Sequence, residues 1–192
     1  AGRGREALAQ ADIAISFGYA QELSHVLKAL VYGRIYSDYR RQKTLASKAL
    51  SYDPTYDEGY LVRAEAEYML GEYPACIKDA AANSSLAPAG PDGYQSGILC
   101  MEAAGDYAGS EKSCHKILAL KPGDHAALWH LGRAYAGQGR HREAIARFTE
   151  AIRLSGGRPS YFIDRAQSCE AEGDFSCCAW DYDMAAAWDE IG

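Results

Sequence analysis

The chain has 192 residues, of which 48% are hydrophobic and 24% are charged, as in an ordinary globular domain or a modest repeat array. Its formal net charge of −6 argues against a nucleic-acid-binding surface, which needs a basic face. No apolar run approaches the roughly 18 residues that a membrane-spanning helix needs. We therefore expect neither a nucleic-acid partner nor a membrane partner.

The first predicted element, residues 1–21, is a helix that belongs to an incomplete repeat. The stretch from Gly2 to Ala9 matches the stretch from Gly139 to Ala146 almost residue for residue. Because the later stretch follows a mid-repeat turn, residues 1–21 are expected to form the second helix of a partial repeat. This start predicts a segment of a longer protein, or an end that is covered by self-association.

Residues 22–56 are predicted to form a degenerate repeat of two helices. The repeat begins near Leu23, has Ser37 and Asp38 at its mid-repeat turn, and reaches Pro54 at its end. Proline cannot continue the hydrogen-bond ladder of a helix, so Pro54 marks the end of the second helix.

Four further repeats follow with a period of 34 residues. Glycines recur at the mid-repeat turn and prolines recur 17 residues after it, namely Gly71, Gly105, Gly139 and Gly173, and Pro54, Pro88 and Pro122. Glycine supplies the left-handed residue that closes the first helix of a pair. The spacing predicts repeats at 57–90, 91–124, 125–158 and 159–192, of which the last is apparently uncapped.

Within each repeat the apolar residues follow helical spacing. Leu128, Leu131 and Tyr135 lie on one face of the first helix of their repeat. Gly132 and Ala144 stand where the two helices of that repeat cross most closely. Small residues at these positions allow the two backbones to approach.

The stretch from Trp129 to Tyr135, with Gly139, Ala144 and Phe148 after it, resembles the tetratricopeptide repeat pattern. It departs from that pattern in having Gly156 where the family usually has proline, and in the spacing of Trp129, which is one residue closer to Leu131. The resemblance covers 57–188 strongly and 22–56 more weakly. It implies an all-α fold, a right-handed superhelical α-solenoid of antiparallel two-helix repeats with a concave groove.

No motif for chemistry is found in the sequence. It contains no phosphate-binding glycine-rich loop, no dinucleotide fingerprint, no metalloprotease histidine pair and no nucleophile elbow. The spacing of His125, His130 and His141 fits no zinc site. We therefore expect no catalytic residue, no cofactor and no metal.

The six cysteines form no Cys-x-x-Cys motif, which argues against zinc. Most of them take inward helical positions, where a free cysteine behaves as a small hydrophobic residue; these are Cys76, Cys100, Cys114, Cys169 and Cys178. Buried free thiols are the favoured interpretation. The alternative is a disulfide from Cys169 to Cys177 or Cys178, which requires an oxidising compartment.

Asn83-Ser84-Ser85 matches the N-glycosylation pattern. Asn83, however, occupies a repeat position that holds alanine in Ala49, Ala151 and Ala185 and that is expected to pack inward. A glycan there would obstruct the fold, so the pattern favours an unglycosylated, reducing location. We expect the protein to be cytoplasmic.

The negative charge is concentrated in the last repeat, 159–192. That segment contains one base, Arg165, and eight acids, namely Asp164, Glu170, Glu172, Asp174, Asp181, Asp183, Asp189 and Glu190. A solvated helix face is one interpretation. A docking surface for a basic partner is the other.

The resemblance implies that the first helix of each pair lines the concave groove. The residues expected to bind a partner there are Leu61, Glu65, Tyr68, Met69, Gln95, Leu99, Glu102, Trp129, Arg133, Ile163, Gln167 and Glu170. Their large apolar members are typical binding anchors. Alternatively, some of them belong to the core of a slightly shifted register, with Trp129 the weakest assignment.

These features predict a non-catalytic protein–protein interaction scaffold. Its groove would accept a peptide or partner segment with apolar anchors and some basic character. The alternatives are a recruiting domain of a larger enzyme or J-domain co-chaperone, and a scaffold that self-assembles through uncapped ends. The basic clamp of chaperone adaptors that hold acidic tails is missing, since its positions hold Leu61, Val62, Glu65, Asp92, Gln95 and Ser96.

Overall fold

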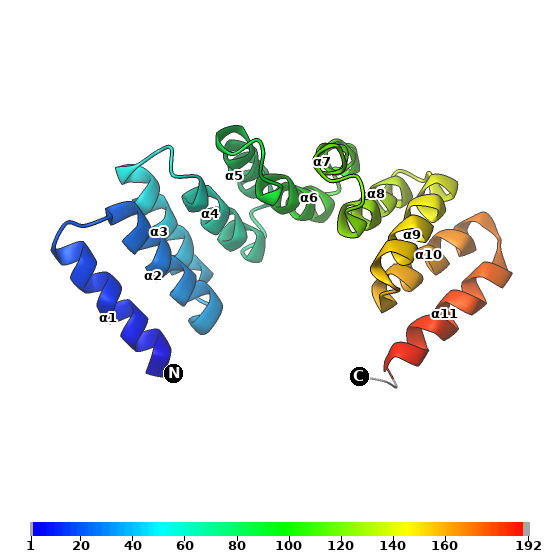
Figure 1. Cartoon of the computed structure of the whole chain (residues 1–192), viewed down its shortest axis with the longest axis horizontal. Helices are drawn as coiled ribbons and strands as arrows, with labels where there is room; N and C mark the ends of the chain where they lie inside the picture. The colour runs from blue at the N-terminus through cyan, green and yellow to red at the C-terminus, as the bar shows by residue number, and fades with distance from the viewer. Residues whose placement is uncertain (1, 190–192) are drawn as a thin grey trace. The chain divides into compact units, whose positions relative to one another are not determined.

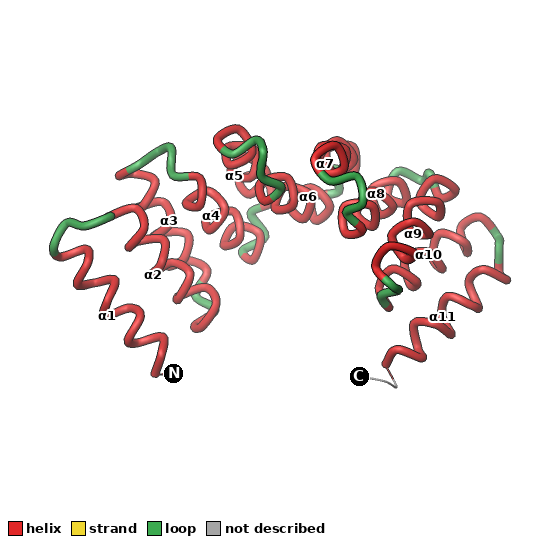
Figure 2. Tube along the Cα trace, viewed as in Figure 1, coloured by secondary structure: helices red, strands yellow, loops and turns green. Residues whose placement is uncertain are grey.

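The computed structural model describes residues 2–189, and within that range the chain consists of helices joined by short turns, with no strand (Figure 2). The predicted all-α fold is confirmed. The helices are, in chain order, α1 (Gly2–Ser16), α2 (Gln21–Tyr36), α3 (Tyr39–Tyr52), α4 (Asp57–Met69), α5 (Tyr73–Leu86), α6 (Asp92–Ala104), α7 (Tyr107–Leu120), α8 (His125–Gly137), α9 (His141–Ser155), α10 (Pro159–Glu172) and α11 (Phe175–Asp189). Over the same described residues, no helix has both the length and the apolar character needed to cross a membrane.

The chain divides into two compact units within α6. Unit 1 ends at Cys100 and unit 2 begins at Met101. Consecutive helices pack on each other in both units, as α2 does on α3 and α8 does on α9 (Figure 1). In addition, α2 contacts α4 and α8 contacts α10, so the first helices of neighbouring repeats adjoin. This is the arrangement that stacked two-helix repeats require.

The mid-repeat turns have the predicted backbone geometry. The φ angles of Gly71, Gly105, Gly139 and Gly173 are 75°, 76°, 75° and 79°. This left-handed conformation closes the preceding helix, and residues with a Cβ adopt it at a cost. At the turn of the degenerate repeat, Ser37 takes the same conformation with φ of 54°.

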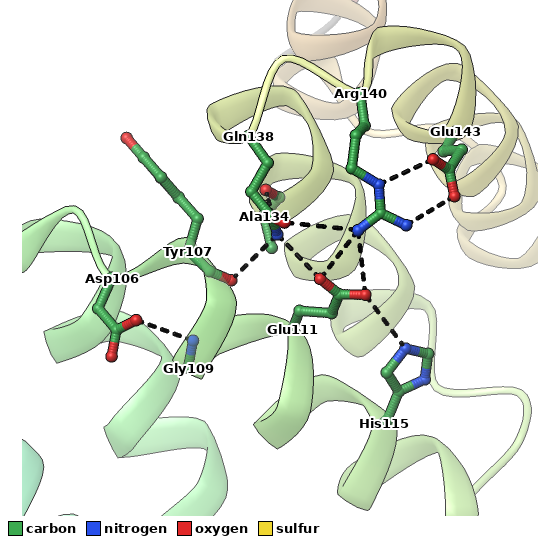
Figure 3. Close-up of polar contacts among 9 residues, drawn as sticks. All are labelled: Asp106, Tyr107, Gly109, Glu111, His115, Ala134, Gln138, Arg140 and Glu143. Atoms are coloured by element: carbon green, nitrogen blue, oxygen red, sulfur yellow. Dashed lines mark hydrogen bonds and ion pairs between the residues drawn. The ribbon is translucent and has the colours of Figure 1, made fainter.

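A cluster of ion pairs holds the turn that follows Gly139 (Figure 3). Arg140 Nη2 lies 2.7 Å from Glu143 Oε2, and Arg140 Nη1 lies 3.0 Å from Glu111 Oε2. Gln138 Nε2 donates to the same Glu111 carboxylate at 2.9 Å. The amide of Gln138 and the guanidinium of Arg140 together hold the pKa of Glu111 below its usual value. The cluster ties α7 to the start of α9.

The small residues predicted at the helix crossings are required by the packing. Phe148 is fully buried, and a Cβ at Gly132 would lie 2.5 Å from Phe148 Cε1, so α8 and α9 approach there only because Gly132 lacks a side chain. At the equivalent crossing in unit 1, Cys76 Sγ lies 3.2 Å from the Ala64 carbonyl oxygen, so α4 and α5 are in close contact there.

In unit 2 a half-buried arginine connects three helices. Arg165 of α10 donates to the Asp181 carboxylate of α11 from Nε at 2.9 Å and from Nη2 at 2.6 Å. Its Nη1 donates to Thr149 Oγ1 of α9 at 2.9 Å. We call this set the arginine bridge of unit 2. It joins the last helix pair to the helix before it.

Unit 1 has a second arginine bridge at the same repeat positions, three 34-residue periods earlier. Arg63 of α4 donates to Asp79 of α5 from Nη2 at 2.8 Å. Arg63 Nη1 donates to Ser47 Oγ of α3 at 3.4 Å. Each unit therefore has its own polar connection across three helices.

Candidate functional site

An apolar hollow of about 460 Å³ lies along α2 and α4 in unit 1. A second hollow, of about 280 Å³, lies along α4 and α6 and shares Glu65 and Ser96 with the first. We call the two together the leucine groove. Its large apolar residues are Leu23, Val26, Leu27, Leu30, Tyr56, Leu61, Val62, Tyr68 and Leu99.

The unit 1 residues that the sequence predicted for a groove lie at or near these hollows. Leu61, Glu65, Tyr68, Gln95 and Leu99 line the leucine groove. The remaining predicted residue of unit 1, Met69, is exposed but lines neither hollow. The structure thus brings most of the predicted residues of this unit to one surface, and whether they bind a partner stays a prediction.

The sequence prediction missed the contribution of α2. Leu23, Leu27 and Leu30 supply one side of the groove, and Leu27 is 48% exposed. These residues follow an i, i+4, i+7 spacing, which places them on one face of a helix. The sequence showed this spacing. However, the repeat at 22–56 matches the repeat pattern too weakly to assign its positions, so the direction in which this face of α2 points could not be predicted.

The polar rim of the leucine groove is mainly acidic. The hollows are lined by the carboxylates of Glu58, Glu65 and Asp92 and by one base, Arg34. Glu58 also lies beside Asp57, and the hydrogen bond between the two carboxyl groups raises the pKa of Glu58. Two adjacent carboxylates repel each other, and a cation placed between them would relieve that repulsion.

In unit 2 the predicted charged residues bind each other. The buried Glu102 carboxylate accepts from His130 Nδ1 at 2.9 Å and forms an ion pair with Arg133, whose Nη1 lies 2.9 Å from Glu102 Oε2. Both oxygens of Glu102 therefore have partners within the unit. Glu102 and Arg133 hold α6 to α8, which leaves less of their charge available to a partner.

Trp129 is half-buried, with its ring and its N–H both in contact with neighbours. Its indole stacks on the Tyr161 ring with centroids 5.1 Å apart, and its Nε1–H donates to Asp164 Oδ2 at 2.6 Å. Arg133 covers the indole at 5.1 Å from the ring centroid. Burial raises the pKa of Asp164, and the indole hydrogen bond opposes that rise. Trp129 therefore contributes to packing, as the shifted-register alternative anticipates.

The other predicted residues of unit 2, Ile163, Gln167 and Glu170, are exposed. Gln167 lines a hollow of about 250 Å³ together with Tyr107 and Arg133. This hollow is more polar in its lining than the leucine groove, with few large apolar anchors. The apolar character expected of a peptide site is concentrated in unit 1.

Replacing Trp129 with phenylalanine is expected to lower the free energy of unfolding by about 1–2 kcal/mol at pH 7. Phenylalanine keeps the stacking on Tyr161 but leaves the Asp164 carboxylate without its indole donor. The folded pKa of Asp164 is already raised, so the substitution raises it further and makes the ionised form costlier. A raised carboxyl pKa gives stability that is present at low pH and lost as the pH rises through the folded value.

The loss of unfolding free energy in the Trp129→Phe variant is therefore expected to be larger at pH 7 than at pH 4. Urea unfolding at the two pH values, followed by far-ultraviolet circular dichroism, measures it. A deficit that does not change with pH would show that lost packing, and not the hydrogen bond to Asp164, causes the destabilisation.

The cysteine interpretation needs correction. The favoured prediction of free thiols is wrong for Cys76, Cys100 and Cys169, because the structure pairs Cys76 with Cys100 and Cys169 with Cys177. The second pair is the predicted alternative across the last helix pair, and the first was not predicted. The paired Cα atoms are 6.0 Å and 6.1 Å apart, which suits a disulfide.

The other two cysteines, Cys114 and Cys178, are buried and free, as predicted. Burial raises the pKa of the Cys114 thiol to about 12. Among the described residues, one group has the spacing of metal ligands, formed by Cys169, Cys177 and Asp181. Its two sulfurs are paired with each other and its carboxylate is held by Arg165.

Two predictions about polar residues can be compared with the structure. Asn83 is buried and its Nδ2 donates to the Asp57 carbonyl oxygen at 2.9 Å, so it packs inward as expected. Three acids of the last repeat have partners within unit 2, and whether the exposed acids form a docking surface stays a prediction. Asp181 binds Arg165, Asp164 accepts from Trp129, and Asp174 accepts from the Cys177 backbone N–H at the start of α11.

Comparisons with known proteins agree with this architecture. The tetratricopeptide repeat family matches residues 102–161. MamA from Desulfovibrio magneticus RS-1 is similar in fold, with a TM-score of 0.81 at 14% identity over 89% of this chain and 96% of that chain. YrrB, described as a tetratricopeptide repeat protein with an unusual peptide-binding site, gives 0.74 at 14% identity over 91% and 90%. The thermophilic protein TTC0263 from Thermus thermophilus gives 0.68 at 17% identity over 85% and 89%. No curated protein matches the chain by sequence.

Proposed function

We propose that this chain is a tetratricopeptide repeat protein, and that it acts as a non-catalytic scaffold whose leucine groove binds a peptide segment of another protein. The segment carries leucine-like anchors and basic residues. The binding surface lies in unit 1, along α2, α4 and the first part of α6.

The observation that carries the proposal is a set of leucines gathered in a hollow and left open to solvent. Leu23, Leu27 and Leu99 are exposed, and all three line the leucine groove. Contiguous exposed apolar surface on a folded protein usually marks an interaction site. The hollows are concave, so an inserted side chain would be covered on several sides, as binding anchors are.

The charge of the rim supports a basic partner. Three carboxylates, those of Glu58, Glu65 and Asp92, face the groove against the single cation Arg34. A lysine or arginine beside Glu58 would also offset its repulsion with Asp57. Complementary charge of this kind speeds association and excludes partners of the wrong sign. YrrB, the fold relative with a described peptide-binding site, supports the class of function and no particular partner.

Two matched probe peptides test the proposal. The lysine peptide is a fluorescein-labelled segment of about 15 residues with leucines on one helical face and lysines on the other, following the i, i+3, i+4, i+7 pattern of groove-binding helices. The glutamate peptide replaces every lysine with glutamate. Fluorescence anisotropy is expected to show at least about tenfold tighter binding of the lysine peptide, since the rim carries net negative charge.

A third peptide keeps the composition of the lysine peptide but scatters its leucines around the helix. It is expected to bind as weakly as the glutamate peptide. If the scattered peptide binds as well as the patterned one, the attraction is a general effect of charge. If the glutamate peptide binds as well as the lysine peptide, the proposed partner chemistry is wrong.

A further inference from the structure

The Cys76–Cys100 disulfide lies at the wall of the leucine groove. Cys100 lines the second hollow together with Gln95, Ser96 and Leu99, and Cys76 belongs to α5 behind it. The pair packs with Ala64 of α4 in one buried cluster. The disulfide therefore joins α6, which forms one side of the second hollow, to α5, which packs on α4, the helix that forms the other side.

The face of α6 that packs on α5 has few side chains to hold it. Gly93, Gly97 and Cys100 follow an i, i+4, i+7 spacing and are all buried. A Cβ at Gly93 would lie 2.5 Å from Ser84 Oγ, so the helices are in close contact there. Glycines allow close approach but contribute no interlocking side chain. Among these three residues, Cys100 alone provides a covalent connection.

The adjoining face of α6 carries the other groove residues. Gln95, Ser96 and Leu99 line the hollow with Glu65 and Tyr68 of α4. Fixing α6 through Cys100 therefore fixes the distance between two sides of the binding surface. A surface that is held in its binding geometry loses less conformational entropy when a peptide binds.

We propose that the Cys76–Cys100 pair is a redox switch that sets the peptide affinity of the leucine groove, an inference that rests on the proposed function. In the disulfide form α6 is held and the groove binds tightly. In the dithiol form only the glycine face and Ile98 hold α6 in place. The peptide must then fix the position of α6 when it binds, which weakens the affinity. Two unbonded sulfurs also need roughly 1.5 Å more separation than a disulfide bond, which moves α6 away from α5.

The chemistry is thiol–disulfide exchange with a small disulfide such as oxidised glutathione. One cysteine thiolate attacks the small disulfide, forms a mixed disulfide and releases one small thiol. The second cysteine attacks the protein sulfur of the mixed disulfide, which closes the Cys76–Cys100 bond and releases the second small thiol. The protein loses two electrons and two protons, and the small disulfide gains both. Reduced glutathione drives the reverse reaction; the pair is almost fully buried, so glutathione must reach it from the side of the groove that Cys100 lines when the helices around it open.

The test titrates the lysine peptide into the protein in oxidised and in reduced glutathione buffers. Alkylation of free thiols followed by mass spectrometry reports the state of each cysteine. We expect about tenfold weaker binding once Cys76 and Cys100 are reduced. We also expect bound peptide to slow the reduction of this pair and to leave the rate at Cys169–Cys177 unchanged, because that disulfide belongs to unit 2.

Paired variants separate the two disulfides. Cys76→Ala with Cys100→Ala is expected to show the weaker affinity in both buffers, whereas Cys169→Ala with Cys177→Ala is expected to keep the redox response. If circular dichroism shows that the first variant is unfolded, the reduced unmodified protein carries the comparison. The switch is refuted by equal affinity in the two states, by a response that survives without Cys76 and Cys100, or by a pair that glutathione leaves oxidised.

The proposed function and the switch fail in different ways. If the oxidised protein does not distinguish the lysine peptide from the glutamate peptide, the proposed function is wrong, and the switch with it. If the oxidised protein distinguishes them and reduction changes nothing, the switch alone is wrong.

Discussion

Replacing Arg165 with methionine is expected to lower the free energy of unfolding by about 3–5 kcal/mol. The side chain of Asp181 is completely buried and that of Arg165 is 12% exposed. The guanidinium donates two hydrogen bonds to the carboxylate and a third to Thr149. Methionine fills most of the space but leaves the Asp181 charge in the interior without a partner. Urea unfolding followed by circular dichroism measures the loss.

The control for this prediction removes both charges. Arg165→Met combined with Asp181→Leu is expected to recover most of the stability, because a buried ion pair can be replaced by apolar residues at little cost. If the double variant is as unstable as the single one, the loss comes from the packing of Arg165 against Phe162 and Trp180, whose rings lie 6.0 Å and 5.9 Å from the guanidinium carbon. The outcome therefore separates charge from packing.

Replacing Leu27 or Leu99 with aspartate is expected to weaken binding of the lysine peptide by at least about 30-fold, the loss typical of a truncated binding anchor. Both residues line the leucine groove and both are exposed, at 48% and 42%, so neither change disturbs the core. The added negative charge would by itself favour a basic peptide. A loss in spite of that charge would therefore show that the leucines act through apolar contact. Fluorescence anisotropy measures the affinity.

Leu86 provides a matched control for these two variants. It is also 42% exposed and belongs to unit 1, but it lines neither hollow of the groove. Leu86→Asp is expected to bind the lysine peptide as tightly as the unmodified protein or slightly more tightly. If Leu86→Asp loses as much affinity as Leu27→Asp, the peptide does not bind in the leucine groove.

The sequence could predict the features that depend on one backbone requirement at one position. Gly139 is needed because its turn has a positive φ, and Gly132 is needed because Phe148 fills the space where its Cβ would lie. Such requirements recur at a fixed spacing, so the 34-residue period was visible in the sequence. Ser37 takes the turn conformation without being glycine, and for that reason the repeat at 22–56 was only weakly recognisable.

The features that depend on pairs of distant side chains could not be predicted in the same way. Cys76 and Cys100 belong to different repeats, and nothing in their spacing distinguishes a bonded pair from two buried thiols. Trp129 was assigned to the groove because of its repeat position. Its contacts with Tyr161 and Asp164 depend on the neighbouring repeat, which the pattern of one repeat does not describe.

The two arginine bridges also affect which helices of similar sequence pair with each other during folding. The positions equivalent to Arg165 and Asp181 hold Leu131 and Arg147 one period earlier. If α10 docked on α9 in place of α11, Arg165 would face Arg147, and Asp181 would be left without a counter-ion. Misassembly between similar repeats is a characteristic failure of such chains. The bridges therefore favour the correct pairing of helices, since each arginine finds its carboxylate only on the other helix of its own pair.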